Sequence, residues 1–311
     1  MNEKSEKLLS VIVPAYNEEE VIPQTFQTIK EILDEAAIPF ELLFIDDGSA
    51  DRTYSVISEL SKSHAEVKGL SFSRNFGKEA ALFAGLEAAA GACCVTIDCD
   101  LQHPPKTIVE MYRLWEQGFE VVEGVKSSRG KESAFHGLAA HAFYGMISKA
   151  TGFDMENASD FKLLDRRAID ALLILPERAP FFRALSSWVG FKTTSVSFEV
   201  QDRAAGTSKW SLRSLTRYAI QNITSFSNAP MQLVTWAGWI MFLMFVILGV
   251  QTLYKYFTGS ALEGFTTVIL LQLIIGSMLM LALGIIGHYI SRIYDEIKCR
   301  PRYIISKRCG K

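Results

Sequence analysis

The stretch VTIDCDLQHPP, Val95 to Pro105, starts as an apolar run and ends in two aspartates and a double proline. A short apolar run that is bounded by a turn is typical of a buried strand. Residues two apart on an extended segment point the same way, so we expect Asp98 and Asp100 to present both carboxylates into one space beyond the strand end. The stretch therefore predicts a core strand and a concentration of negative charge behind it.

Two carboxylates this close together need a compensating charge. Like charges repel at such a separation, and one of the groups would otherwise tend to stay protonated. A divalent cation removes the conflict, and oxygen ligands, with Gln102 nearby, suit Mg²⁺ or Mn²⁺ better than zinc. Such an ion would stabilise a departing diphosphate as a Lewis acid. The competing interpretation is a solvated turn with incidental aspartates.

The N-terminal half of the chain alternates between short apolar runs and segments of helical character. Helical segments are expected, for example, at Val21–Ala37 and Arg52–Ser63. Strand and helix repeated in this way predict an α/β fold with a mostly parallel, Rossmann-like sheet and helices on both of its faces. The predicted strands are Leu8–Val13, Phe40–Ile45, Val67–Phe72, Ala92–Ile97 and Phe119–Val125.

Polar residues gather after each of the first four predicted strands. These segments read PAYNEEE, DDGSADRT, SRNFGKEAA and DCDLQHPP. Ligands of parallel sheets bind beyond the carboxyl ends of the strands, so we expect the functional site at this edge. The first strand is followed by no glycine-rich dinucleotide turn, and no Walker loop is present, so a nucleotide would be held in a different way.

The C-terminal part of the chain is far more apolar than the rest. The whole chain has 311 residues, 49% hydrophobic content and a net charge of -2. Two uncharged runs, Leu233 to Tyr254 and Phe265 to Ile290, each exceed the roughly 20 residues that cross a bilayer as a helix. They predict a two-helix transmembrane hairpin over residues 231–291. Two buried helices of a soluble protein are the alternative interpretation.

Basic residues flank the two runs on both sides, while the connecting segment KYFTGSALEG is nearly uncharged. By the positive-inside rule, the flanks and the large N-terminal domain face the cytoplasm. The charged start MNEKSEKLLS does not predict a secretory signal, and the five cysteines are expected to be reduced. The basic flanking residues are Lys209, Arg213, Arg217, Arg292, Lys298, Arg300, Arg302, Lys307, Arg308 and Lys311.

The segment KWSLRSLTRYAIQNITSF, residues 209–226, has an amphipathic pattern. Its apolar residues recur every three or four positions beside a basic stripe, which predicts a helix lying in the membrane interface over residues 206–230. A helix packed on the soluble domain is the alternative. The predicted organisation is therefore a cytoplasmic domain over residues 1–205, this interfacial region, the hairpin, and a basic cytoplasmic tail over residues 292–311.

Several motifs together resemble a known family. VIVPAYNEEE, DDGSADRT, SRNFGKEAAL, DCDLQHPP, SDFKLLDRRAID and QDRAAGTSKWSLRSL occur in this order before the two apolar runs. They resemble the family 2 glycosyltransferases that load a sugar onto a polyprenyl phosphate, the dolichol-phosphate mannose synthase-like branch. The likeness is greatest to bacterial undecaprenyl-phosphate, or bactoprenol, glycosyltransferases. The resemblance implies a GT-A fold and covers nearly the whole chain.

The resemblance assigns roles to the residues at the sheet edge. In the family, the Asp-x-Asp signature and a nearby side chain bind the metal, which implies Asp98, Asp100 and Gln102 here, whereas Cys99 is expected to turn into the core. For Glu18 to Glu20, an acidic first helical turn is the alternative interpretation. The residues implied in binding the nucleotide sugar are Pro14, Tyr16, Glu18, Asp46, Asp47 and Asp98.

The resemblance also implies a set of catalytic and phosphate-handling residues. Asp160 in ASDFKLL matches a family aspartate, and we expect it to orient the sugar or the acceptor; a helix N-cap is the alternative. His103, beside the metal turn, could contact a phosphate. Arginine forks and a lysine suit a site with so much phosphate charge. For Lys209, Arg213 and Arg217, attraction of anionic lipid at the membrane face is the alternative interpretation. The residues implied in binding the acceptor phosphate are Arg129, Arg203, Ser208 and Lys209. The expected catalytic residues are Asp100, Asp160, Arg129, Arg203 and Lys209.

The implied activity is that of a metal-dependent hexosyltransferase. A lipid phosphate oxygen would attack the anomeric carbon of a nucleotide sugar, with inversion in one displacement. The expected donor is UDP-glucose or UDP-N-acetylglucosamine, with mannose on GDP or a modified pentose as the alternatives. The expected acceptor is undecaprenyl phosphate on the cytoplasmic membrane face. The product would supply cell-envelope glycosylation. No nucleic-acid partner is expected, whereas Gly276 and Gly284 would allow a homodimer or homotetramer to pack through the hairpin.

Two other functions stay open at this point. A processive polysaccharide synthase shares the domain, but such enzymes carry a Gln-x-x-Arg-Trp motif, and in FFRALSSWVG the residues Arg183 and Trp188 lie too far apart. An inactive, membrane-anchored nucleotide-sugar binding or scaffold protein is the second alternative. The intact aspartates and basic residues of the motifs argue against it.

Overall fold

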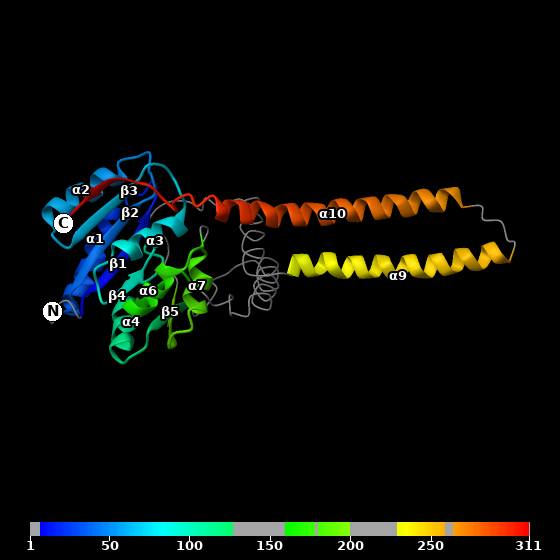
Figure 1. The fold of residues 1–311 in the computed structure, drawn as a ribbon. Coiled ribbons are helices and arrows are strands. Elements are labelled where there is room, and N and C mark those ends of the chain that lie inside the picture. The colour runs from blue at the N-terminus through cyan, green and yellow to red at the C-terminus, as the bar shows by residue number, and fades with distance from the viewer. Residues whose placement is uncertain (1–6, 127–158, 178–179, 200–228, 259–263, 311) are drawn as a thin grey trace. The chain divides into compact units, whose positions relative to one another are not determined.

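The computed structural model describes residues 7–126, 159–177, 180–199, 229–258 and 264–310. The chain divides into two compact units. Residues Met1–Lys209 and Arg300–Lys311 together form the first, here called the sheet unit, and Trp210–Cys299 form the second, here called the helical unit. Figure 1 shows both as a ribbon. The predicted interfacial helix falls almost wholly on residues 200–228, outside the described residues.

Among the described residues, the sheet unit holds an eight-stranded sheet in the order β7-β5-β6-β4-β1-β2-β3-β8. The pairs β1–β2, β2–β3, β1–β4 and β5–β7 are parallel, whereas β6 is antiparallel to both of its neighbours and β8 is antiparallel to β3. The prediction of a mostly parallel α/β sheet is confirmed. The strands are β1 Leu9–Ala15, β2 Phe40–Asp46, β3 Val67–Phe72, β4 Cys93–Thr96, β5 Val121–Lys126, β6 Lys162–Asp165, β7 Thr193–Phe198 and β8 Ile305–Cys309.

Helices cover both faces of this sheet, as predicted. On one face α1 contacts α2 and α4, and on the other α3 contacts α6 and α7. Alternate residues of β1 face the two layers: Val11 and Val13 share a core with Phe26 of α1, whereas Ile12 packs against Gly85 of α3. The helices of this unit are α1 Ile22–Glu35, α2 Thr53–Ser63, α3 Lys78–Ala88, α4 Lys106–Glu116, α6 Arg166–Ile174 and α7 Phe182–Trp188.

The sequence dictates how α1 and α3 pack. In α1 the buried residues Ile22, Phe26, Ile29 and Leu33 recur every three or four positions, which gives one apolar face. In α3 the residues from Ala80 to Leu86 are all buried, so the helix is enclosed by its neighbours. A Cβ atom at Gly85 would lie 2.3 Å from Ile12 Cγ2, so only glycine permits this close approach of α3 to the sheet.

The C-terminal strand β8 is a feature that sequence reasoning did not anticipate. It follows a segment in which Arg302 donates to the main-chain carbonyls of Glu177 at 2.9 Å and Leu175 at 2.6 Å. The Tyr303 ring stacks on Phe72 of β3 with centroids 5.0 Å apart. The strand itself, ISKRC, is short and basic, as is common for edge strands that must not pair with other chains. The same composition is typical of a solvated tail, so the sequence did not indicate a strand.

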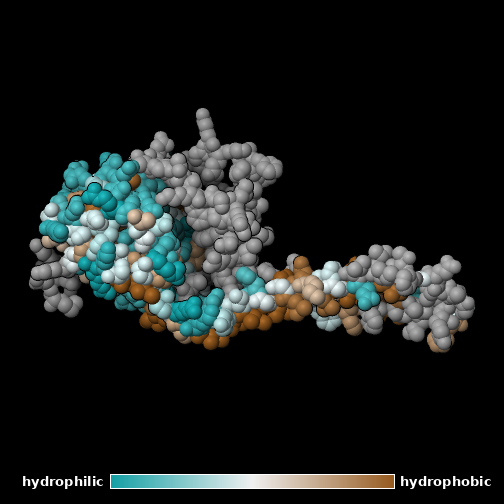
Figure 2. Space-filling view, turned by 90° about the horizontal axis from the view of Figure 1, so that it is seen from above, coloured by the Kyte–Doolittle hydropathy of each residue, from teal (hydrophilic) through white to brown (hydrophobic). Residues whose placement is uncertain are grey.

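The helical unit contains α9, Ala229–Phe257, and α10, Phe265–Ile297. Within the described residues, one helical segment is long and apolar enough to cross a membrane, Ile274–Ile297, and α9 holds a shorter apolar segment, Val234–Leu248. Figure 2 shows brown, apolar side chains along the part of the helical unit that faces the viewer. Two membrane crossings therefore remain a proposal. Packing between copies through Gly276 and Gly284 also stays a prediction.

Candidate active site

The strand order places the predicted site residues at a switch in chain direction across the sheet. From β1 the chain proceeds to β2 and β3 on one side, and then returns to β4 on the other side of β1. Ligands of open α/β sheets bind in the crevice outside the carboxyl ends of the strands at such a point. Tyr16 and Glu18 follow β1, and Asp98 and Asp100 follow β4, so these four residues flank the switch point.

The loop after β1 is locked to the loop after β2 by hydrogen bonds. Asn17, at a φ of 55°, donates its main-chain N–H to Ser49 Oγ at 2.9 Å, and its side chain accepts from the Ala50 N–H at 2.9 Å. The Glu18 N–H donates to Thr53 Oγ1 at 2.9 Å. Pro14 lies within β1, and Tyr16 is 39% exposed, so its ring is accessible at the sheet edge.

The acidic run Glu18 to Glu20 does not form the first turn of a helix. Helix α1 begins at Ile22 and has no acidic residue in its first turn, so that alternative interpretation was wrong. The carboxylate of Glu19 instead accepts the Arg52 N–H at 2.9 Å, at the residue that precedes α2. Glu19 therefore stabilises the start of α2, and Glu18 remains the acidic residue of this run for which a ligand contact is predicted.

Asp46 is the last residue of β2 and Asp47 follows it; both are almost fully buried, at 2% and 4% exposure. Asp46 accepts from Ser71 Oγ at 2.7 Å and from the Ser49 N–H at 2.9 Å. Asp47 accepts from the main-chain N–H groups of Phe76 at 2.6 Å and Gly77 at 2.9 Å. Burial raises the pKa of Asp47, and these two N–H groups oppose the rise. The two aspartates therefore connect the loop after β2 to β3 and to the loop that follows β3.

The two aspartates of the quoted stretch lie beyond the end of their strand. β4 ends at Thr96, and the backbone turns at Leu101 with a φ of 56° while the Gln102 N–H donates to Asp100 Oδ1 at 3.2 Å. Strand alternation therefore does not set the direction of the two carboxylates, which corrects that step of the sequence argument. A turn, not an extended segment, presents Asp98 and Asp100.

Cys99, between them, is buried at 4% exposure, as expected. Its carbonyl accepts from Thr25 Oγ1 at 2.7 Å, and burial raises the pKa of its thiol to about 12. A neutral, buried thiol does not coordinate a hard cation, so the exclusion of Cys99 from the metal ligands agrees with its position.

Asp160 lies at the centre of an ion-pair network. Lys78, at the start of α3, bridges Asp98 Oδ1 at 2.6 Å and Asp160 Oδ2 at 3.0 Å. Arg183 of α7 donates from Nε to Asp160 Oδ1 at 3.1 Å, and its Nη2 lies 3.1 Å from Oδ2. Burial alone would raise the pKa of Asp160, but Lys78 and Arg183 outweigh burial and hold that pKa well below its ordinary value. Asp160 is therefore an ionised carboxylate.

The N-cap interpretation of Asp160 was wrong. The residue that caps α6 is Asp165, whose carboxylate accepts the Arg167 N–H at 2.9 Å. Lys78 and Arg183 were missing from the predicted site. Lys78 stands in the segment after the third strand, where its position could have indicated a role, whereas only the fold brings Arg183 to Asp160.

His103 adds a polar atom beside Asp98. Its ring stacks on Phe161 with centroids 5.0 Å apart, and its Nδ1 lies 4.0 Å from Asp98 Oδ2. Within the described part of the chain, this Nδ1 is buried and has no hydrogen-bond partner. Burial lowers the pKa of His103, against the opposing charge of Asp98. A buried polar atom of this kind suits a bound polar group, so the predicted phosphate contact stays a prediction.

The residues around Asp98 fit a hard divalent cation. No group of three or more His, Cys, Asp or Glu side chains that could hold a metal gathers in the described ranges. Mg²⁺ is typically bound through one or two protein carboxylates plus substrate phosphates and water, which is what Asp98 and Asp100 offer. The predicted phosphate-binding residues Arg129, Arg203, Ser208 and Lys209 lie outside the described residues.

Comparison with known proteins identifies the family. Residues 10–172 match the glycosyl transferase family 2. An uncharacterised glycosyltransferase of Bacillus subtilis, YkcC, is 42% identical over 97% of this chain and 94% of its own length. The SfII prophage-derived bactoprenol glucosyl transferase of Shigella flexneri is 36% identical over 96% of this chain and 97% of its own length. The chain therefore belongs to the family 2 glycosyltransferases and is close to the bactoprenol glucosyl transferases.

A solved structure supports the assignment of the fold. Glucosyl-3-phosphoglycerate synthase from Mycobacterium tuberculosis, in a complex with Mg²⁺ and uridine diphosphate, matches with a TM-score of 0.54 at 22% identity. The match covers 72% of this chain and 81% of that one. The predicted GT-A-like α/β fold is thereby confirmed. The resemblance to the family is confirmed by the sequence matches given above.

Proposed function

We propose that this glycosyltransferase transfers one sugar from a nucleotide sugar to undecaprenyl phosphate at the cytoplasmic membrane face, with inversion. The donor is UDP-glucose or UDP-N-acetylglucosamine. The observation that carries the proposal is the 36% identity to a bactoprenol glucosyl transferase over 96% of the chain, which spans the apolar helices as well as the sheet unit. The product is a lipid-linked sugar for cell-envelope glycosylation.

The nucleotide end of the donor binds along the ends of β1 and β2 in this proposal. Pro14, Tyr16 and Glu18 line the end of β1, and Asp46 and Asp47 line the end of β2. The hydrogen bonds between the two loops hold these groups in place before the donor arrives, which lowers the entropic cost of binding. The exposed Tyr16 ring offers a surface on which a base can stack.

The diphosphate binds at the turn after β4. Asp98, Asp100 and Gln102 would hold Mg²⁺ or Mn²⁺, which would act as a Lewis acid on the leaving diphosphate. Lys78 already lies between Asp98 and Asp160 and is 41% exposed, so its ammonium can turn toward phosphate oxygens. His103 Nδ1, beside Asp98, can donate to one of them.

The acceptor side depends on Asp160 and the basic residues. Because a lipid phosphate is already ionised at pH 7, the displacement needs no strong general base. Asp160 is fixed as a carboxylate by Lys78 and Arg183, so we assign it the orientation of the sugar or acceptor. Arg129, Arg203, Ser208 and Lys209 bind the acceptor phosphate in this proposal.

The path of the chain supports two membrane crossings. β8 belongs to the same sheet as β1, so the chain leaves the sheet unit before Trp210 and re-enters it at Arg300. An intervening segment that starts and ends on one membrane face must cross an even number of times. We take α10 as one span and α9 as the second, and the basic flanks favour a sheet unit on the cytoplasmic side.

The test measures transfer of radiolabelled sugar from a panel of UDP- and GDP-sugars to undecaprenyl phosphate. Wild type, Asp100→Asn and the exposed control Asp34→Asn are assayed with Mg²⁺ or Mn²⁺ and with EDTA. We expect label in the lipid fraction from one UDP-sugar, lost with the chelator and in Asp100→Asn but kept in Asp34→Asn. No transfer from any donor by a protein that still binds a nucleotide would refute the proposal and favour a binding protein.

A further inference from the structure

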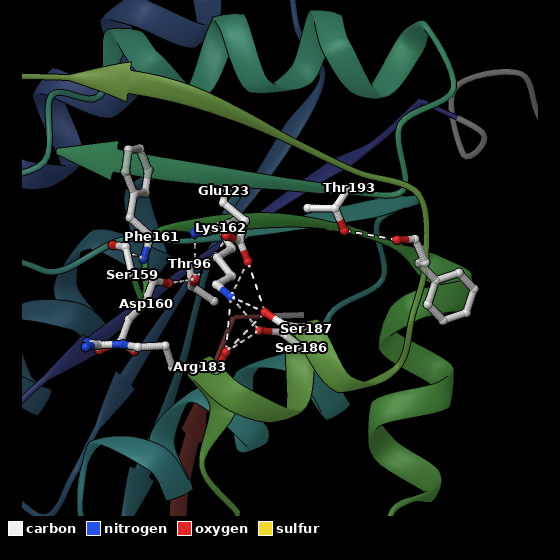
Figure 3. Close-up of polar contacts among 11 residues, drawn as sticks. Thr96, Glu123, Ser159, Asp160, Phe161, Lys162, Arg183, Ser186, Ser187 and Thr193 are labelled. Carbon is white, nitrogen blue, oxygen red and sulfur yellow. Dashed lines mark hydrogen bonds and ion pairs between the residues drawn. The ribbon is translucent and has the colours of Figure 1, made fainter. Parts of the chain in front are cut away.

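Lys162 carries a positive charge into the interior of the sheet unit. Its side chain has 0% exposure, and its Nζ lies 2.6 Å from Glu123 Oε1 on the neighbouring strand β5. The same ammonium donates to Ser186 Oγ at 2.8 Å and to the main-chain carbonyl of Arg183 at 3.2 Å, both on α7. Figure 3 shows this arrangement. A fourth partner, Ser187 Oγ of α7, lies 3.4 Å from the same nitrogen. The ammonium of one lysine thus connects two strands of the sheet to one helix.

Arg183 is held at both of its ends by one short segment. Its main-chain carbonyl accepts from Lys162, and its guanidinium binds both carboxylate oxygens of Asp160, which precedes Lys162 by two residues (Figure 3). Paired contacts between a guanidinium and a carboxylate fix direction as well as distance. The hydroxyl of Thr96 also binds the main-chain carbonyl of Asp160, which holds this segment to β4.

We propose that Lys162 is a positioning residue for Asp160. Lys162 fixes the main chain of α7, and α7 in turn places the Arg183 guanidinium against the Asp160 carboxylate. The first residue of α7 does not depend on Lys162, because the Phe182 N–H donates to the Glu79 carboxylate at 2.8 Å. Without Lys162, Ser187 Oγ, which donates to Glu123 Oε1 at 3.2 Å, would still tie the end of α7 to β5. The turn that carries Arg183 would lose its bonds to β6, because the Arg183 carbonyl and the Ser186 hydroxyl would have lost the Lys162 donor. The inference rests on the proposed function only through the orienting role given to Asp160.

Stability alone does not account for a lysine at this place. Burial lowers the pKa of Lys162, with Glu123 opposing, so the interior disfavours its charge. Replacing a buried ion pair by packed apolar side chains is often neutral or stabilising. What an apolar side chain cannot do is donate to the Arg183 carbonyl and the Ser186 hydroxyl together. The specific consequence of Lys162 is therefore the position of α7.

The test uses the full chain in detergent. Lys162→Met alone would leave Glu123 without its ammonium partner, so the main variant is Lys162→Met with Glu123→Gln, which removes both charges and keeps the volumes. Lys192→Met, at an exposed lysine before β7, is the matched control. The measurements are hydrogen exchange of residues 182–188 by mass spectrometry, and kcat and KM for the sugar donor, each with and without Arg183→Ala.

We expect faster exchange in α7 of the double variant while β1 keeps its protection. We also expect kcat to fall about 10- to 100-fold with KM changed less than about twofold, because a misplaced group costs rate more than binding. Adding Arg183→Ala should cost less than about twofold more, since both changes act through one contact. The control Lys192→Met should resemble wild type in all of these measurements.

Three results would overturn the inference. The first is unchanged hydrogen exchange in α7 of the Lys162→Met, Glu123→Gln variant. The second is a loss of kcat on combination with Arg183→Ala that equals the product of the separate losses. The third is a rise in KM with kcat unchanged. If wild type transfers no sugar from any donor, the proposed function fails by itself. The exchange measurement then still decides whether Lys162 positions α7, because it needs neither donor nor acceptor.

Discussion

Glu79 predicts a measurable dependence of stability on pH. It lies beside Lys78 at the start of α3, and its carboxylate accepts the Phe182 N–H of α7 at 2.8 Å. Burial and the nearby negative charge of Asp160 raise the pKa of Glu79 from 4.5 to about 7, although Phe182, Lys78 and Arg183 oppose the rise. The folded protein therefore holds a proton on Glu79 at pH values where the unfolded chain has released it.

The sign and size of the effect follow from this difference. Below pH 4.5 both states are protonated, whereas between 4.5 and about 7 the folded state binds more protons, so stability falls as pH rises. At about 1.4 kcal/mol per pKa unit, the full cost above pH 7 would be about 3 kcal/mol. Glu79 keeps part of its exposure to water, so we expect a cost of about 1–2 kcal/mol in practice.

The variant Glu79→Gln removes the proton linkage but keeps an oxygen that can accept the Phe182 N–H. We expect equal stability of variant and wild type near pH 4.5, and a variant that is more stable by about 1–2 kcal/mol at pH 8. That corresponds to a gain of about 2–8 °C in Tm for a unit of this size. The assay is thermal unfolding of the full chain in detergent at several pH values. The exposed control Glu35→Gln should show no pH-dependent gain.

A gain that is the same at pH 5 and pH 8 would refute this reasoning, because it would come from packing and not from a proton. A variant that is less stable than wild type at pH 8 would refute it as well. In that case the ionised carboxylate would contribute more through the Phe182 N–H and Lys78 than its burial costs.

Three further predictions concern the metal turn, a glycine and the C-terminal strand. Lys78→Met removes the ammonium that pairs with Asp98, so it should tighten the binding of Mn²⁺ in the absence of nucleotide by about threefold to tenfold. An electron paramagnetic resonance titration measures this affinity, and weaker binding by the variant would contradict the prediction. Gly48→Ala should destabilise the sheet unit by about 3 kcal/mol or more in chemical unfolding, because the glycine has a φ of 66° and a Cβ would lie 2.3 Å from the Arg74 carbonyl carbon. An unchanged midpoint would show that the loop relaxes. Arg302→Ala should speed hydrogen exchange in β8 but not in β1, because it removes two bonds to the segment that follows α6. Equal exchange in variant and wild type would show that β8 is held without these bonds.

The fold was predictable where the sequence carries a local period. The five expected strands and the helices α1 and α2 appear within about two residues of their predicted ends, because each has its own apolar pattern. β6, β7 and β8 were not predicted. For β6 and β8 the reason is the lack of such a pattern. KLLD and ISKRC are short, and each becomes a strand only because the sheet offers a partner, Cys93–Thr96 for β6 and Val67–Phe72 for β8.

The candidate site was predictable in its residue types and not in its contacts. Asp98, Asp100 and Asp160 were named from motifs, but their partners come from distant parts of the chain. Lys78 lies 82 positions from Asp160, and Arg183 lies 23 positions from it. Such pairs are created by the packing of α3 and α7 on one face of the sheet, and no spacing rule along the chain encodes them.

The charges of the described site explain why the proposed donor needs added cations. In the described part of the chain, Lys78 pairs with Asp98 and Asp160, and Arg183 pairs with Asp160. Asp46, Asp47 and Asp100 add three more carboxyl groups at the same edge of the sheet. A nucleotide sugar brings a diphosphate of further negative charge into the same crevice, and like charges at close range repel. A divalent ion at Asp98 and Asp100 would offset part of this charge, and the arginines and lysine at positions 129, 203 and 209 would offset more. Chelation should therefore weaken donor binding as well as rate, which a binding titration with EDTA would detect as a rise in Kd.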